Sequence, residues 1–308
     1  MERRELEYFA AIAEHGSFTG AAHALRVAQP SLSHAIGTLE QELGGRLFHR
    51  LAHGVRLTSA GEALLEPAHQ VMRDLNTAGD SVRRVLGLDS GSLDIVSQTT
   101  LAVDPLAELV GQFLRQHPKV AVRVQDPELG TDVTSSVRGG ECELGMVDSD
   151  TEIKEMDSIL LRGREIRAVL PPQWEVSNQD RINCAELSEM DFVTTPESTA
   201  TREIIEHAVG GRRPRPRVAV ETAHQAMIVP LVLAGAGATL LPKSMAEAAR
   251  RDGAVVMPLR PRLVRRGRLF WRPGPLSPAA GEFVDMASRH AARRAGADRA
   301  RADEEGSG

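Results

Sequence analysis

The stretch "VAQPSLSHAIGTLEQELGG", residues 27–45, combines a proline, several small polar side chains and an apolar stripe. Its apolar positions recur at helical spacing, at Leu32, Ile36, Leu39 and Leu43. Pro30 stands where this helix should begin. Its missing N–H costs nothing there, because the first N–H groups of a helix have no acceptor within the helix. The stretch therefore predicts a helix that starts at Pro30 and exposes Gln29, Ser33 and His34.

The rest of residues 1–58 predicts two more short helices and a hairpin. One helix ends at Gly16, Ser17 is typical of the N-cap of a second helix, and the turn at His53-Gly54 suits a hairpin. Two short helices joined by a tight turn are typical of a helix-turn-helix, whose second helix enters the major groove of DNA. Gln can pair with adenine there, and Ser with bases or phosphates. The alternative is a helical structural domain whose polar turn only faces water.

The charge of the chain does not by itself indicate DNA binding. The formal net charge is −5, and over residues 1–59 six arginines balance six glutamates. Three of these arginines, Arg46, Arg50 and Arg56, follow the quoted stretch closely. A domain without net positive charge needs more than one copy to accumulate phosphate contacts.

Residues 59–87 predict one long helix that could join such copies. Ser59 and Glu62 form a capping-box pattern, Pro67 predicts a kink, and the apolar positions follow the 3.5-residue spacing of a coiled-coil seam. From residue 92 onward, predicted strands alternate with predicted helices, among them one capped by Asp104 and opened by Pro105, which favours a largely parallel α/β sheet. Residues 293–308 are charged without apolar periodicity and predict a disordered tail.

Several classes of protein are disfavoured by the sequence. The apolar run 226–242 is shorter than a membrane span and reads as a buried helix, a glycine stop and a strand. The first residues alternate charged and apolar side chains, unlike a signal peptide, and the two cysteines lack disulfide or metal spacing, which suits a reducing cytosol. His49 and His53 are four apart, but nothing completes a metal site. Neither a nucleophile elbow nor a P-loop is present, and we expect no metal, no cofactor and no catalytic residues.

The segments "ELEYFAAIAEHGSFTGAAHALRVAQPSLSHAIGTLEQELGGRLFHR" (5–50) and "GVRLTSAGEALL" (54–65) resemble the N-terminal signature of the LysR-type transcriptional regulators. "LAGAGATLLP" (233–242) is similar to the glycine segment of that family's C-terminal half. The resemblance implies a multidomain α+β fold. It comprises a winged helix-turn-helix (1–58), a dimerising linker helix (59–90) and a periplasmic-binding-protein-like α/β effector domain (91–292). Subdomain I of that domain would span about 91–163 and 266–292, and subdomain II about 164–265.

The resemblance also implies partners. They are double-stranded promoter DNA with an interrupted palindrome, a small-molecule inducer, a second copy or three further copies of the chain, and RNA polymerase. The protein would be a cytoplasmic transcriptional regulator without membrane contact and not an enzyme. By position, the residues expected to contact the DNA bases or enter the major groove are Gln29, Pro30, Ser31, Ser33 and His34. Arg50 and Arg56 would lie near phosphates, and His53 at the wing tip, where the family often has an arginine.

Hydroxyl-rich stretches at predicted strand–helix junctions are the candidates for inducer contacts. They supply Gln98, Thr99, Thr100, Thr131, Thr195 and Ser198. In the resembling family, positions matching Thr99, Thr100 and Thr131 often line the inducer site. Hydroxyls and free N–H groups at helix starts suit an anion, so we expect a small organic anion between the subdomains. The competing interpretation is that these residues are ordinary N-caps.

Two other functions remain as alternatives for residues 92–292. The same two-subdomain fold occurs in some enzymes and in transport-binding proteins, but the first 58 residues predict a helix-turn-helix in place of a signal peptide. DNA compaction without small-molecule control would leave more than two hundred residues of α/β domain without a role. The inducer, the target genes, the direction of regulation, and dimer versus tetramer stay open.

Overall fold

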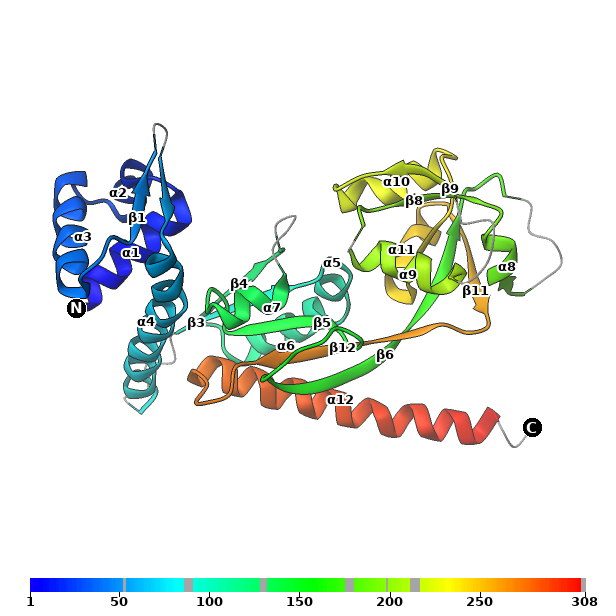
Figure 1. Ribbon diagram of the computed structural model, residues 1–308. Helices are drawn as coiled ribbons and strands as arrows, with labels where there is room; N and C mark the ends of the chain where they lie inside the picture. Colours follow the sequence, from blue (N-terminus) through cyan, green and yellow to red (C-terminus); the bar gives the residue numbers. More distant parts are fainter. Residues whose placement is uncertain are drawn as a thin grey trace.

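The computed structural model describes residues 1–51, 54–85, 91–127, 132–174, 180–197, 199–210 and 217–305. Figure 1 shows a small N-terminal domain, a long helix leading away from it, and a larger C-terminal domain whose two halves lie side by side. The predictions at His53, Thr131 and Ser198 lie outside the described residues. Within the described part, no helix is long and apolar enough to cross a membrane.

The N-terminal domain has three helices and a two-stranded wing among its described residues. They are α1 (Arg3–His15), α2 (Phe18–Leu25), α3 (Gln29–Leu43), β1 (Phe48–Arg50) and β2 (Val55–Leu57). Gly16 ends α1 in the left-handed conformation at φ 62°, and the Ser17 hydroxyl accepts the Gly20 N–H at 3.0 Å. Both features agree with the sequence prediction. The core of this domain includes Phe9, Leu32 and Leu39, each fully buried.

The long helix α4 (Ser59–Val85) connects the two domains. Its N-cap is Thr58, whose hydroxyl accepts the Gly61 N–H at 3.1 Å, so the capping box predicted at Ser59 and Glu62 is one residue too late. Pro67 lies inside the helix as expected. Ala68 is buried and Met72 half-buried against the N-terminal core, whereas Val71, Leu75 and Val82 on the same helix are exposed.

Subdomain I contains a strand core flanked by helices. Its elements are β3 (Gly91–Ser97), α5 (Thr99–Leu101), η1 (Ala102–Leu106), α6 (Ala107–Gln116), β4 (Val120–Gln125), α7 (Val133–Arg138) and β5 (Leu144–Asp148). Strand β3 pairs in parallel with β4 and β5. The C-terminal helix α12 (Pro278–Glu305) packs on this core, where Phe283 contacts Phe113 at a centroid distance of 5.4 Å. Figure 1 shows α12 running beneath the sheet.

Subdomain II has a core of its own. Its elements are β7 (Ile182–Asn183), α8 (Cys184–Leu187), β8 (Asp191–Thr194), α9 (Ala200–Val209), β9 (Arg217–Glu221), η2 (Gln225–Met227), α10 (Ile228–Leu233), β10 (Thr239–Pro242), α11 (Lys243–Arg251) and β11 (Val255–Arg260). The apolar run 226–242 becomes α10, a turn with Gly235 at φ 89°, and β10, as predicted. Strands β8 and β9 pair in parallel.

Two long strands run through both subdomains. Strand β6 (Asp157–Leu170) pairs antiparallel with β12 (Val264–Trp271) and, toward its end, with β10 and β11. The boundaries predicted near 163 and 265 therefore fall inside these two strands. The expectation of a largely parallel sheet is wrong, because the crossing strands pair antiparallel with β5, β10 and β11 and with each other. Strand alternation with helices does not specify the direction of strands that cross between subdomains.

Two further expectations differ from the structure. Asp104 has extended backbone angles within a kink, but its carboxylate accepts the Ser244 hydroxyl and does not cap the following helix. The tail predicted to be disordered over 293–308 is helical up to Glu305. Alanine and arginine, which dominate this segment, have high helix propensity, so α12 continues without an apolar pattern in its sequence.

Candidate nucleic-acid interface and effector region

Helix α3 begins at Gln29, one residue before Pro30, after Ala28 in extended conformation. Pro30 is therefore the second helical residue, where an N–H would still lack an acceptor within the helix. Leu32, Ile36 and Leu39 are buried as predicted. Leu43 is 47% exposed, because the helix has passed the edge of the core by its last turn.

The opening of α3 presents a polar face. Gln29, Pro30, Ser31 and His34 are exposed, and Ser33 is half-buried. The Gln29 amide donates to the Ser33 hydroxyl at 2.8 Å, so these two side chains, four residues apart, lie together. The Gln29 carbonyl oxygen stays available as an acceptor, and a second amide hydrogen stays available as a donor. This is the pair of groups that an adenine edge requires.

The wing is attached to α3 by a carboxylate that the sequence did not single out. The Glu40 Oε1 atom accepts the N–H groups of Leu47 and Phe48 at 2.8 Å and 3.4 Å. Strand β1 pairs antiparallel with β2, as the hairpin prediction required. The N–H of Val55 donates to the Gly16 carbonyl at 2.8 Å, which ties β2 to the end of α1. The wing and α3 are therefore held in a defined relative position.

A small hollow separates the wing from α3 and has two arginines at its edge. Its volume is about 260 Å³, and its lining includes Ser33, Gly37, Arg46 and Arg50. The Arg50 guanidinium lies 5.5 Å from the ring centroid of Phe18, a cation–π distance that restrains its position. Arg56 lies opposite His49 on the wing and is exposed. Guanidinium groups and hydroxyls of this kind suit phosphate oxygens.

The predicted inducer residues on subdomain I gather at one end of β3. The Gln98 side-chain oxygen accepts the Asp148 N–H at 2.9 Å, and the Thr99 hydroxyl donates to Asp126 at 3.2 Å. The Thr100 hydroxyl is buried and has no hydrogen-bond partner among the described residues. Thr195, in the segment between β8 and α9, is buried and shares a hydrogen bond with Thr199. Helix α9 contacts α5, so the two sets of residues belong to facing subdomains.

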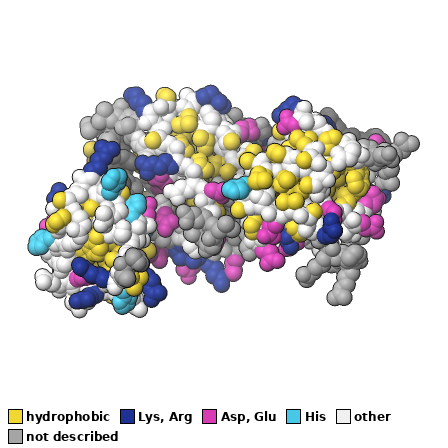
Figure 2. All heavy atoms as spheres, turned by 90° about the horizontal axis from the view of Figure 1, so that it is seen from above, with side chains coloured by type: hydrophobic (Ala, Val, Ile, Leu, Met, Phe, Trp, Pro, Cys, Tyr) yellow, Lys and Arg dark blue, Asp and Glu magenta, His cyan; other side chains and the backbone are white. Residues whose placement is uncertain are grey.

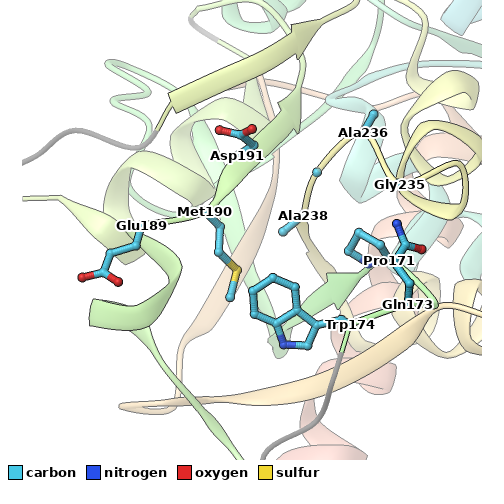
Figure 3. A pocket seen from close by; sticks show the side chains of 10 residues that line it. Pro171, Gln173, Trp174, Glu189, Met190, Asp191, Gly235, Ala236 and Ala238 are labelled. Carbon is cyan, nitrogen blue, oxygen red and sulfur yellow. The ribbon is translucent and has the colours of Figure 1, made fainter.

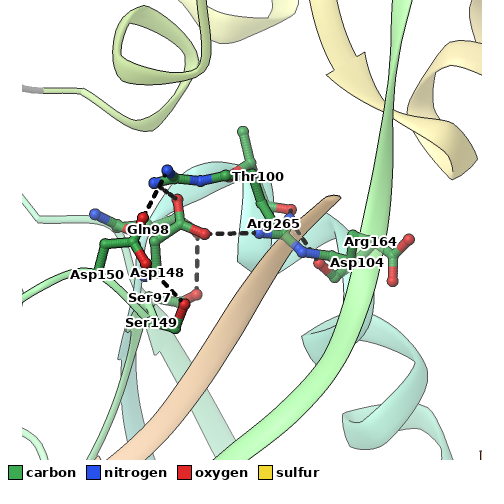
Figure 4. A network of polar contacts seen from close by, with 9 residues as sticks. All are labelled: Ser97, Gln98, Thr100, Asp104, Asp148, Ser149, Asp150, Arg164 and Arg265. Atoms are coloured by element: carbon green, nitrogen blue, oxygen red, sulfur yellow. Dashed lines mark hydrogen bonds and ion pairs between the residues drawn. The ribbon is translucent and has the colours of Figure 1, made fainter. Parts of the chain in front are cut away.

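The main charged group of this region is a pair of arginines that lie opposite each other on the crossing strands (Figure 4). Arg164 on β6 and Arg265 on β12 are register partners. Their Nη2 atoms lie 3.2 Å and 3.3 Å from the two carboxylate oxygens of Asp148, which is 1% exposed. Burial lowers the pKa of Arg164, and Asp148 acts in the opposite direction. The carboxylate thus keeps two neighbouring cations together inside the protein.

Arg265 is buried but also contacts a carboxylate at the surface. Arg265 Nη1 lies 2.9 Å from Asp150, whose side chain is 68% exposed. Arg164 is enclosed instead, and its Nη1 donates to the carbonyls of Thr100 and Asp104 at 3.2 Å each. Burial raises the pKa of Glu203 on α9, an effect that Arg265 opposes.

Sequence reasoning missed Arg164, Arg265 and Asp148. The available signal was charge inside strands that are otherwise apolar, as in "REIRAVL" and "VRRGRLF". The register between two strands so distant along the chain was not readable from the sequence. Among the described residues, no group of three or more His, Cys, Asp or Glu side chains could hold a metal ion.

Two models of known protein families together match most of the chain. Residues 3–62 match the family described as bacterial regulatory helix-turn-helix protein, lysR family, and residues 86–292 match the LysR substrate binding domain. The transcriptional activator HcaR of the hca operon of Escherichia coli K12 is 27% identical over 92% of this chain and 96% of its own length. The HTH-type regulator YdcI of the same organism is 31% identical, over 65% of each chain.

Solved structures show the same fold. A full-length variant of OxyR from Pseudomonas aeruginosa superposes with a TM-score of 0.74 and 22% identity, covering 94% of this chain and 95% of that one. Full-length CbnR in complex with its target DNA superposes with a TM-score of 0.67 and 22% identity, covering 94% and 100%. At 22% identity this likeness establishes the fold of the chain but not the ligand that it binds.

Proposed function

This chain belongs to the LysR family of bacterial DNA-binding transcriptional regulators, and we propose that a small organic anion bound between its two C-terminal subdomains controls it. The exposed opening of α3, where Gln29 and Ser33 lie together, carries the DNA-binding half of the proposal. In this proposal Gln29, Pro30, Ser31, Ser33 and His34 face the major groove. Arg50, Arg56 and the wing residue His53 lie along the phosphate backbone or the neighbouring minor groove.

Mutation of the polar face tests DNA recognition. Gln29→Ala and Ser33→Ala should weaken binding to the protein's own promoter site, identified by genomic footprinting, by roughly 1–3 kcal/mol while leaving binding to unrelated DNA unchanged. Both side chains point away from the core, so the melting temperature should stay constant. Gln41→Ala, an exposed change at the other end of α3, is the matched control. An equal loss of folding stability and binding would mean that the polar turn is structural.

Arg265 supports the anionic character of the inducer. Asp148 fixes one edge of its guanidinium inside the protein, while the other edge contacts the exposed Asp150. A carboxylate from a ligand can replace Asp150 there, because arginine binds carboxylates through paired N–H groups. Gln98 and Thr99 lie on the same side of subdomain I as Thr100, whose hydroxyl has no hydrogen-bond partner among the described residues. The predicted contacts from Thr131, Thr195 and Ser198 would complete the site.

Calorimetry with matched organic acids, alcohols and amines tests the ligand class. We expect carboxylates to bind and to raise the melting temperature, and Arg265→Gln to abolish this binding while Asp150→Asn leaves it intact. If only neutral or cationic compounds bind between the subdomains, the proposal of an anionic inducer is wrong.

Association of several copies is expected to proceed through α4. Val71, Leu75 and Val82 are 40%, 43% and 60% exposed, although their spacing forms a continuous apolar stripe. Figure 2 also shows apolar side chains on the upper face of the C-terminal domain. Val124 and Met227 are further exposed apolar side chains of this domain. We propose a homodimer or homotetramer that acts on promoter DNA in the cytoplasm and contacts RNA polymerase.

A further inference from the structure

A second hollow lies in subdomain II and takes no part in the proposed inducer site (Figure 3). Its volume is about 590 Å³, within the range of small-molecule sites. Its walls come from three segments: the residues after β6, the residues before β8, and the turn that precedes β10. The described lining is Pro171, Gln173, Trp174, Glu189, Met190, Asp191 and residues 235–238.

The hollow lies at the end of subdomain II that is remote from subdomain I. It touches Asp191 and Ala238, which stand at the beginning of β8 and just before β10. The opposite ends of the same strands face subdomain I, because Thr195 follows β8 and Ser244, soon after β10, bonds to Asp104. At about 3.3 Å per residue, a four-residue strand separates these ends by about 10 Å. A ligand in this hollow would therefore not occupy the inducer site.

The shape of the hollow depends on two glycines. Gly235 has φ 89°, and a Cβ atom there would meet the Gln173 amide at 2.4 Å. Gly237 has φ 150°, and a Cβ atom there would meet the Asp191 carbonyl at 2.5 Å. Glycine has no side chain, so only glycine at these two positions lets the turn pass this close to Gln173 and Asp191.

The lining favours a flat ring. Trp174 is 39% exposed despite its size, and Figure 3 shows its indole next to Met190, with Ala238 and Pro171 nearby. Tryptophan and methionine offer polarizable surfaces that bind aromatic rings. The ring of a ligand can stack on Trp174 against the Met190 side chain.

The charges of the lining favour a cation. None of the described lining residues is basic, whereas Glu189 and Asp191 are both acidic. Asp191 is neutralised by Arg217 through two contacts of 2.6 Å and 2.7 Å. Glu189 is exposed and has no basic partner among the described residues. The Trp174 ring face also attracts cations.

From these observations we infer that the hollow is an accessory site for a small aromatic or heteroaromatic amine, with its ring on Trp174 and its ammonium group at Glu189. This site goes beyond the proposed function, since it requires neither DNA nor the anionic inducer. It also differs from the inducer site in the sign of charge that it selects.

Three probes with the same ring test the inference on the full chain: benzylamine, benzyl alcohol and benzoate. The chain has two tryptophans, so in the Trp271→Phe variant the emission reports on Trp174 alone. We expect benzylamine to quench this emission saturably and to bind about tenfold more tightly than the other two probes, from one ion pair and one cation–π contact. Calorimetry on the unaltered chain gives the same comparison without the substitution.

Glu189→Gln should remove the preference for benzylamine. Trp174→Ala, which removes the ring surface of the hollow, should abolish binding of all three probes in calorimetry. Glu186→Gln, an exposed carboxylate on neighbouring α8 outside the lining, should leave the preference intact. Absence of saturable benzylamine binding, equal affinity for benzoate, or a preference that survives Glu189→Gln would overturn the inference. Each of these results is independent of DNA binding, so failure here is distinguishable from failure of the proposed function.

Discussion

Asp148 is the residue on which the junction of the two subdomains depends most. It contacts Arg164 and Arg265 at once, and all three side chains are buried. Without its charge, two guanidinium groups would stand opposite each other on adjacent strands, and only the exposed Asp150 would still contact Arg265. The backbone register that places them there cannot relax without shifting both crossing strands.

We therefore expect Asp148→Asn to lower the free energy of unfolding by about 3–5 kcal/mol, the cost of breaking a buried ion pair. Chemical denaturation followed by circular dichroism measures this change. Asp150→Asn removes the exposed carboxylate on the same Arg265 and should cost less than about 1 kcal/mol. Similar losses for both variants would contradict the role assigned to burial.

Cys142 illustrates how burial decides the reactivity of a single side chain. Burial raises the pKa of its thiol to about 12, and Asp94 and Glu141 add to this effect. The thiol is therefore protonated at neutral pH, and only the thiolate is a good nucleophile. In a Cys184→Ser background, Ellman's reagent should label Cys142 at pH 8 only after the chain is unfolded. Complete labelling of the native protein within the same time would refute this prediction.

At the scale of elements, helix boundaries followed from local chemistry. Gly16 ends α1 because a left-handed residue is needed there, and Ser17 starts α2 because its hydroxyl accepts a free N–H. Helix α4 begins at Ser59 as predicted, but its cap is Thr58 and not Ser59. Both residues are suitable caps, and only the position of the wing selects Thr58. Local signals thus predict an element more securely than the residue that caps it.

The exposed stripe of α4 carries a prediction of its own. Leu75→Glu places a charge in the middle of the stripe and should shift the protein to a smaller assembly without unfolding the chain. Sedimentation equilibrium measures the assembly. The dependence of DNA affinity on salt should weaken in parallel, because fewer phosphates are contacted per bound particle. Ala63→Glu, an exposed change off the stripe, is the control. An unchanged assembly for Leu75→Glu would assign association to another surface.

At the scale of the whole molecule, the contact between the subdomains should depend on pH through Glu203. Burial raises the pKa of this carboxyl, so its protonated form stabilises the folded state. That contribution is fully present below the unfolded-state pKa and is lost as the pH rises through the higher folded-state pKa. Glu203→Gln should therefore raise the melting temperature at pH 7, and the gain should disappear near pH 4. Glu197→Gln, exposed before the same helix, should show no such gain.

The sequence alone determined what depends on neighbours within a few residues. The polar opening of α3, its buried stripe and the apolar seam of α4 are local periodicities, and a helix aligns residues three and four apart whatever surrounds it. These features, with the signature around residues 5–65, were enough to predict a DNA-binding regulator with a separate ligand-binding domain. The presence of Gln98, Thr99 and Thr100 at a strand end was predicted in the same way.

Only the tertiary structure decided what depends on partners distant in sequence. The antiparallel direction of β6 and β12, the opposition of Arg164 and Arg265, and the meeting of Trp174 with the glycine turn each join segments tens of residues apart. Strand pairing in such cases is chosen by the packing of the whole domain, because a local pattern leaves both the direction and the register of a buried strand open. For the same reason, the charges that neutralise each other inside this protein could be identified only once the chain was folded.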